Sequence, residues 1–187
     1  MAILELSETL MYDFHYNYIK KYYSDNAKLL FADTDSLMYE IKTDDFYKDI
    51  EHDLNRFDTS DYPVDHPLFS LHNKKVIGMF KDECNGKTID EFVGLRPKHY
   101  SYKMFDGKSN KSAKGVKQGV VKNSITHDDY KNCLLRNVNM SVQQNIIRSY
   151  GHDIFSETVN KVALSEYDDK RSICGTDTLA YGHCRIT

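Results

Sequence analysis

The chain has 187 residues, of which 40% are hydrophobic, so it is long enough to bury a core as one domain or as a lobe of a larger enzyme. Its formal net charge of −3 argues by itself against a nucleic-acid-binding protein, because phosphate binding depends on clustered Lys and Arg. The charge is unevenly divided, since residues 1–110 hold 14 Lys and Arg against 20 Asp and Glu, and residues 111–187 hold 11 against 8. An acidic first part and a basic second part would suit metal chemistry beside a nucleic acid. The alternative interpretation is ordinary variation of surface charge, which would give the same counts.

The four cysteines are far apart and include no C-x-x-C pair, which argues against a zinc site and favours reduced thiols in an intracellular protein. No apolar run approaches the roughly 20 residues of a membrane span, and the N-terminus lacks the pattern of a signal peptide. We therefore expect an intracellular protein without a membrane partner, in either the nucleus or the cytoplasm.

The first predicted element is an amphipathic helix over residues 3–23. Apolar side chains recur there every four residues, at Leu6, Leu10, Phe14, Tyr18 and Tyr22. Because this helix begins almost at Met1, we expect the chain to be a fragment of a longer protein.

A β-hairpin is predicted next. Residues 29–32 form a short apolar strand, expected to be buried on both faces, and residues 37–41 form a second strand. Between them stand Asp33 and Asp35, which would share one face of a regular strand and would repel each other unless a cation lay between them. Mg²⁺ prefers such oxygen ligands, so this pair is a candidate magnesium site.

Two other interpretations of this hairpin stay open. Asp and Ser are common turn residues, so the tip can be a plain turn. An apolar strand followed by D-x-D also occurs in haloacid-dehalogenase-like phosphatases, in which the first Asp, here Asp33, would be the nucleophile. Those enzymes usually carry Thr or Val where this chain has Leu37, and they need a parallel α/β domain, whereas the downstream pattern here is antiparallel.

The rest of the chain mixes short strands and helices. Strands are predicted over residues 76–80, 89–93 and 98–105. Helices are predicted over residues 44–57, 126–136 and 156–164. Residues 58–73 are predicted as a loop, the tail from Ser172 has no clear pattern, and a stretch rich in Lys, Gly and Ser at 106–119 marks a boundary. The predicted fold class is therefore α+β, with domains at residues 1–106 and 107–187.

The segment Phe31–Leu37, which reads F-A-D-T-D-S-L, resembles the third palm motif of family B DNA polymerases, D-T-D-S. In that family the motif lies at the tip of a β-hairpin, and its second Asp coordinates the catalytic metals together with an Asp of the first palm motif. The resemblance implies that Asp35 is the direct metal ligand, that Asp33 is an accessory carboxylate, and that Thr34 and Ser36 support them.

A second likeness lies downstream. Residues 78–83 and 91–100 resemble the stretch that leads into the K-x-Y motif of the same family, which Lys98 and Tyr100 match. On a strand these two residues would share a face, where a cation and a phenol would suit the phosphate and the sugar or base of a primer. A strand with an ordinary Lys and a core Tyr would give the same pattern, but the order of the two motifs is that of the family.

The likeness covers most of the chain and points to the protein-primed polymerases of Maverick (Polinton) transposons. The first helix resembles the palm helix before the third motif. Three further stretches resemble the thumb and tail, at residues 114–117, 168–171 and 178–183. The chain contains neither the D-x-x-S-L-Y-P motif, which bears the other metal-binding Asp, nor the K-x-x-x-N-S-x-Y-G fingers helix.

The resemblance thus implies a partial polymerase palm, formed by an antiparallel sheet with the carboxylate hairpin and a packed helix, followed by a smaller thumb-like region. It implies a DNA-directed DNA polymerase that uses two Mg²⁺ ions. The implied partners are primer–template DNA, deoxynucleotides and a terminal protein that serves as primer. We expect the chain alone to be inactive, and a non-catalytic DNA-binding remnant is the alternative.

Overall fold

A computed structural model describes the chain apart from residues 1, 168–170, 176 and 187. The chain divides into two compact units, Met1–Ile89 and Asp90–Thr187, each with its own hydrophobic cluster. Both units combine helices with small sheets that are mostly antiparallel, so the predicted α+β class is confirmed. Among the helices that the structure describes, none is both long enough and apolar enough to span a membrane.

The first unit opens with a continuous helical segment, as predicted. It consists of α1 (Ala2–Asp13), the π-helix η1 (Phe14–Ile19) and α2 (Lys20–Tyr23), followed by the short 3₁₀ turn η2 (Ser24–Asn26). Phe14 and Tyr18 are buried, whereas Leu6 is 70% exposed. The apolar stripe is therefore buried within the π-helix, whereas Tyr22 in α2 is 63% exposed, and π segments are frequent at functional sites.

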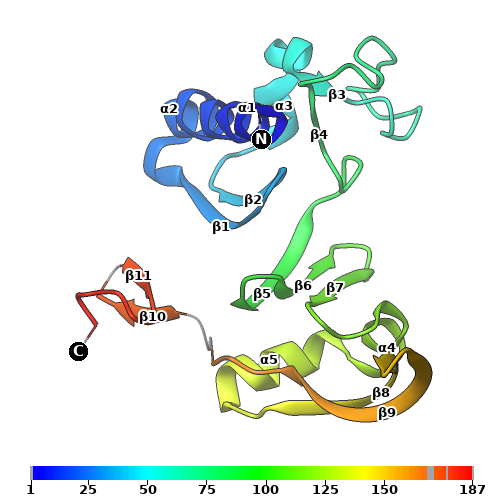
Figure 1. The fold of residues 1–187 in the computed structure, drawn as a ribbon. Helices are drawn as coiled ribbons and strands as arrows, with labels where there is room; N and C mark the ends of the chain where they lie inside the picture. Colours follow the sequence, from blue (N-terminus) through cyan, green and yellow to red (C-terminus); the bar gives the residue numbers. More distant parts are fainter. Residues whose placement is uncertain (1, 168–170, 176, 187) are drawn as a thin grey trace. The chain divides into compact units, whose positions relative to one another are not determined.

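The predicted hairpin is present as β1 (Ala27–Asp33) and β2 (Ser36–Ile41), which pair antiparallel beside the helical segment (Figure 1). Leu37, Tyr39 and Ile41 of β2 pack against the cluster that contains the buried residues of the π-helix. The expectation that β1 is buried on both faces is wrong, because most of its residues are half-buried or exposed, and Leu29 is 39% exposed.

The remaining elements of the first unit are short. They are α3 (Phe46–Ile50), the 3₁₀-helix η3 (Glu51–Arg56), and the parallel pair β3 (Phe57–Asp58) and β4 (Phe80–Lys81). Asp45 caps α3, because its side chain accepts hydrogen bonds from two backbone N–H groups of the first turn. The segment expected as a helix at 44–57 is thus helical along most of its length. The strand expected at 76–80 is reduced to β4, since Lys75 and Gly78 adopt positive φ values of 58° and 87° that only turns accommodate.

In its described residues, the second unit contains a three-stranded sheet, a long β-ribbon, two helices and a small hairpin. The sheet has the order β5 (Ile89–Arg96), β6 (His99–Met104), β7 (Ser109–Ala113). The ribbon consists of β8 (Met140–Tyr150) and β9 (Asp153–Leu164), the helices are α4 (Gln118–Ser124) and α5 (His127–Arg136), and the small hairpin is β10 (Arg171–Cys174) with β11 (Asp177–Ala180). Figure 1 shows α5 lying along the ribbon, and the core between them includes Tyr130, Cys133, Ala163 and Leu164.

Predictions for the second unit had mixed outcomes. The strands at 89–93 and 98–105 and the helix at 126–136 are confirmed, and the last begins with a capping box between Thr126 and Asp129. The helix expected at 156–164 is wrong, because this segment is β9. Its β-branched residues, such as Thr158 and Val159, favour a strand, and β8 pairs with it along its whole length.

The predicted boundary at residues 106–107 lies at the turn between β6 and β7, inside the second unit. Of the stretches that resemble a polymerase tail, residues 168–170 lie outside the described residues, and residues 178–183 form the end of β11 and the turn after it.

Candidate metal-binding hairpin and nucleic-acid-binding residues

The tip of the β1–β2 hairpin is a tight turn with an unusual backbone. Asp33 pairs with Ser36 across the two strands, so Thr34 and Asp35 form the loop. The Asp35 N–H donates to the Asp33 carbonyl at 2.6 Å, and Thr34 between them has a φ of +54°. This is the hydrogen-bond pattern of a γ-turn with positive φ, which is strained, and a β-branched residue is seldom found there. Backbone strain of this kind is concentrated at functional sites.

Within the tip, the Thr34 and Ser36 side chains form hydrogen bonds with Asp33 and none with Asp35. Thr34 Oγ1 donates to Asp33 Oδ1 at 3.3 Å, and Ser36 Oγ donates to the Asp33 carbonyl at 3.3 Å. Asp33 is half-buried, whereas Asp35 is exposed, and its carboxylate forms no hydrogen bond or ion pair within the described residues. Asp33 is therefore held in place by its neighbours, and the Asp35 oxygens are available to a cation.

The predicted common strand face of Asp33 and Asp35 is wrong. The two aspartates do not share a strand face by alternation, because β1 ends at Asp33 and Asp35 lies in the turn. Across the described parts of the chain, no group of three or more His, Cys, Asp or Glu side chains is arranged to hold a metal ion. Mg²⁺ takes six oxygen ligands and often keeps several waters, so the two carboxylates fit part of its ligand set.

A partly buried polar contact fixes the hairpin to the π-helix. His15 Nδ1 lies 2.9 Å from the Tyr39 hydroxyl, and the two rings stack with centroids 5.8 Å apart. Burial raises the pKa of Tyr39 to about 12, and burial, with a contribution from Lys20, lowers the pKa of His15. The hydroxyl and the ring nitrogen thus share one hydrogen bond, and the tautomer of His15 determines which of them donates. Reasoning from the sequence missed this pair, because its partners are 24 positions apart and no local pattern connects them.

Lys98 and Tyr100 belong to the second unit and are placed differently from the prediction. Lys98 lies in the turn before β6 with a φ of +63°, so the expected common strand face of the two residues is wrong. Tyr100 lies on β6, half-buried, with its ring 6.4 Å from that of Tyr102. The Lys98 carbonyl accepts from Lys114 N–H and Ser112 Oγ, both at 3.1 Å. The Lys98 backbone is therefore fixed to the end of β7.

Beside Lys98, His99 is buried between a carbonyl and several cations. Its Nδ1–H donates to the Pro97 carbonyl at 3.3 Å, and its Nε2 faces Arg96 Nη2 at 3.4 Å. Burial lowers the pKa of His99, and although the Pro97 carbonyl opposes this, the charges of Arg96, Lys114 and Lys161 lower the pKa further. His99 is therefore a neutral imidazole in a positively charged surrounding.

This arrangement predicts acid sensitivity of the second unit. His99 has a lower pKa when folded than its ordinary value of 6.5, so the unfolded chain binds its proton first. The contribution of His99 to the free energy of unfolding should be complete above about pH 6.5. It should be lost as the pH falls through the pKa of His99 in the folded protein. Urea unfolding at several pH values between about 8 and 5 would measure it.

The control variant is His99→Asn, which removes the titrating group and should flatten the pH dependence between about pH 6.5 and 5. Glu91 does not interfere in this window, because its hydrogen bond with Lys131 keeps its pKa below the ordinary value of 4.5. An unchanged pH dependence in His99→Asn would contradict the assignment.

A chain of hydrogen-bonded polar groups in the second unit, of which Ser101 and His127 are buried, looks superficially like a catalytic triad. Ser101 Oγ lies 2.8 Å from His127 Nδ1, and His127 Nε2 lies 3.1 Å from Glu91 Oε2. Ser101 is fully buried and donates to the Asn110 carbonyl, and Glu91 also pairs with Lys131. A nucleophile must reach substrate, so this chain of hydrogen bonds joins α5 to the sheet and is not a hydrolytic site.

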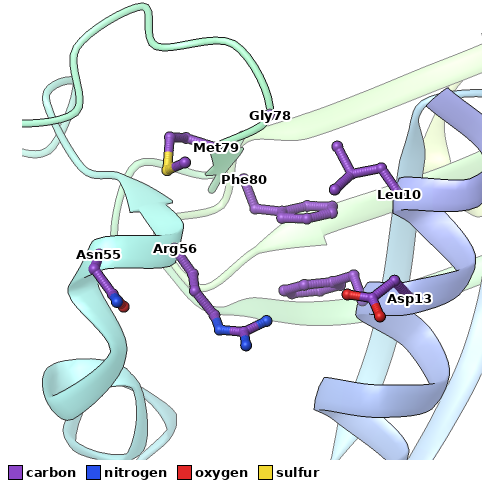
Figure 2. A pocket seen from close by; sticks show the side chains of 8 residues that line it. Leu10, Asp13, Asn55, Arg56, Gly78, Met79 and Phe80 are labelled. Atoms are coloured by element: carbon purple, nitrogen blue, oxygen red, sulfur yellow. The ribbon is translucent and has the colours of Figure 1, made fainter. Parts of the chain in front are cut away.

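The first unit also contains a pocket of about 190 Å³ (Figure 2). Its apolar lining includes Phe14, Phe80, Leu10 and Met79, and the Arg56 side chain also lines it. The Phe14 and Phe80 rings stack with centroids 3.8 Å apart. The pocket is a gap beside an aromatic core cluster, and it is separate from the carboxylate tip in sequence and lining.

Comparison with known proteins identifies no family for this chain. No protein-family model matches the chain, and no curated protein and no solved structure matches it. Its function must therefore be argued from its own residues and their geometry.

Proposed function

We propose that the chain is part of a family B DNA polymerase, in which the hairpin at residues 33–36 forms one wall of a two-metal nucleotidyl-transfer site. The observation that carries the proposal is the D-T-D-S sequence at a strained hairpin tip. Thr34 and Ser36 hold Asp33 there and leave Asp35 exposed. This division of roles agrees with a direct metal ligand at Asp35 and an accessory carboxylate at Asp33.

In this reaction a primer 3′-hydroxyl attacks the α-phosphate of a deoxynucleotide, and two Mg²⁺ ions stabilise the attacking and leaving oxygens. Asp35 would hold metal and Asp33 would support the site. Thr34 and Ser36 keep the tip in one geometry, which reduces the reorganisation needed when metal binds. Lys98 and Tyr100 would contact primer–template DNA. The other metal-binding Asp of the family is not in this chain, so the chain alone is proposed to be inactive.

The test is metal binding at the hairpin. Mn²⁺ in place of Mg²⁺ should broaden the amide NMR signals of Thr34, Asp35 and Ser36 before those of other turns, because an unpaired electron acts over a short distance. Asp35→Asn should abolish the effect. Asp25→Asn, an exposed carboxylate in another turn of the same unit, should leave it unchanged. Broadening at the tip that survives Asp35→Asn would contradict the proposal.

The same protein should give no product in primer extension with Mg²⁺ and all four deoxynucleotides, because half of the metal ligands are missing. Extension by the wild-type chain that is lost in Asp35→Ala would show instead that the chain is a complete enzyme.

A second candidate is a non-catalytic DNA-binding protein, favoured by the distribution of charge. The first unit has 10 Lys and Arg against 17 Asp and Glu, a net charge of −7, and the second has 15 against 11, a net charge of +4. DNA binding that survives Asp33→Ala and Asp35→Ala, without metal binding at the tip, would favour this candidate. We do not propose the phosphatase, because β1 pairs antiparallel with β2 in a sheet of only two strands within the described chain.

A further inference from the structure

The pocket of the first unit combines apolar side chains with charged ones (Figure 2). Its apolar part consists of Leu10, Phe14, Met79 and Phe80. Phe14 is 7% exposed and stacks on Phe80 with ring centroids 3.8 Å apart, so this part of the lining is held by the packed core. The pocket has a volume of about 190 Å³, and a cavity of ~150 Å³ holds a benzene molecule, so one phenyl or branched aliphatic group has room here.

Two opposite charges line the same pocket without pairing. Asp13 is the last residue of α1 and Arg56 the last of η3, and within the described residues neither side chain forms an ion pair. Arg56 Cζ lies 5.3 Å from the centroid of the Tyr18 ring, and Asp13 Oδ1 accepts from Asn17 Nδ2 at 2.8 Å. Each charge is therefore positioned by an uncharged neighbour and is available to an ionic partner.

The presence of both charges restricts the class of ligand. Asp13 and Arg56 are exposed, so a ligand reaches them from solvent. A carboxylate bound by Arg56 would also lie near the Asp13 carboxylate, and an ammonium bound by Asp13 would lie near the Arg56 cation, because both side chains line one small pocket. A ligand that carries both charges avoids this repulsion, since each of its charged groups meets an opposite charge.

We propose that this pocket binds a free α-amino acid with an apolar side chain, such as leucine, methionine or phenylalanine. Arg56 pairs with the carboxylate through its parallel N–H donors, and Asp13 accepts from the ammonium. Asn55, which also lines the pocket, adds an amide that can donate or accept, and the apolar part of the lining takes the ligand side chain. The proposal is independent of the proposed function, because no residue of the hairpin tip lines the pocket.

The experiment titrates the full, isotope-labelled chain with L-phenylalanine and follows the amide NMR signals of Gly78, Met79 and Phe80. These signals should shift and saturate with a Kd on the order of 1 mM, as expected for a ligand of this size in an open pocket. Phenylpropionate, which lacks the ammonium, and phenylethylamine, which lacks the carboxylate, should each bind about tenfold more weakly, the effect of losing one charge-assisted hydrogen bond.

Two variants separate the roles of the charges. Arg56→Gln should weaken the binding of phenylalanine about tenfold and should not weaken that of phenylethylamine. Asp13→Asn should weaken the binding of phenylalanine by a similar factor and should not weaken that of phenylpropionate. The matched controls are Arg136→Gln and Asp25→Asn, which remove exposed charges outside the pocket and should leave the binding of all three ligands unchanged.

The absence of a saturable shift at about ten times the expected Kd would overturn the proposal. Equal weakening of all three ligands by Arg56→Gln or by Asp13→Asn would also overturn it. N-acetylphenylalanine and phenylalaninamide imitate the two ends of a peptide, and binding of either one as tightly as phenylalanine would show that the pocket takes a peptide end instead. Asp35→Asn should leave amino-acid binding unchanged, so failure at this pocket is distinguished from failure of metal binding at the hairpin tip.

Discussion

Replacement of Tyr130 by alanine is expected to destabilise the second unit by about 3–5 kcal/mol, the range for loss of a buried aromatic side chain. Tyr130 has an exposed fraction of 0%, and its hydroxyl donates to the Ser112 carbonyl at 2.9 Å. The variant therefore creates a cavity between α5 and the sheet and leaves a carbonyl without its donor. Since small domains are stable by only about 5–15 kcal/mol, much of the second unit would unfold readily.

Amide hydrogen exchange of β8 and β9 would measure the loss, because it reports on the second unit separately from the first. Two variants control the result. Tyr130→Phe keeps the ring and should cost about 1 kcal/mol for the hydrogen bond alone. Tyr150→Ala, at a position that is 83% exposed, should stay within about 0.5 kcal/mol of wild type. If Tyr130→Ala were as stable as Tyr150→Ala, Tyr130 would not belong to the buried core of the second unit.

Replacement of Phe14 by alanine is expected to destabilise the first unit by a similar amount, about 3–5 kcal/mol. The Phe14 ring is 7% exposed, stacks on Phe80 and meets Phe57 edge to face at 6.0 Å. It also lines the pocket in Figure 2, so its removal enlarges an existing gap that neighbouring side chains do not fill. Amide exchange of β1 and β2 would detect the effect, because both strands pack on this cluster.

A small aromatic ligand such as indole should partly restore the stability of Phe14→Ala, since apolar cavities bind apolar molecules that match their volume. The matched control is Tyr16→Ala, an aromatic residue on the same π-helix that is 61% exposed. Equal destabilisation by both changes, or no effect of indole on Phe14→Ala, would contradict the aromatic cluster as the core of this unit.

Local signals in the sequence predicted several elements correctly. The apolar stripe predicted the first helical segment, the turn residues at 33–36 predicted the hairpin, and the pattern over 126–136 predicted α5, which begins with a capping box. Each of these elements is specified by residues that are close in sequence. The polymerase likeness itself stays a prediction.

The errors concern features that depend on distant partners. The segment 156–164 is a strand because β8 pairs with it, and β8 is itself absent from the predicted elements. Lys98 lies in a turn with positive φ because the Lys98 carbonyl bonds to residues 112 and 114. At the hairpin tip, the sequence identified both aspartates, but the support of Asp33 by Thr34 and Ser36 depends on a strained turn that residue types do not specify.

The β8–β9 ribbon has a consequence for how the second unit folds. Gly151 and His152 at its tip both have positive φ, 58° and 74°, as in the turns whose twist matches that of paired strands. Such a turn sets the register while the strands are still short, and hairpins form within about 1–10 μs. The ribbon can therefore close from its exposed tip toward Ala163 and Leu164, so the residues that bury the core are the last of the ribbon to pair. Formation of the second unit would then be limited by docking of α5 onto a ribbon that already exists.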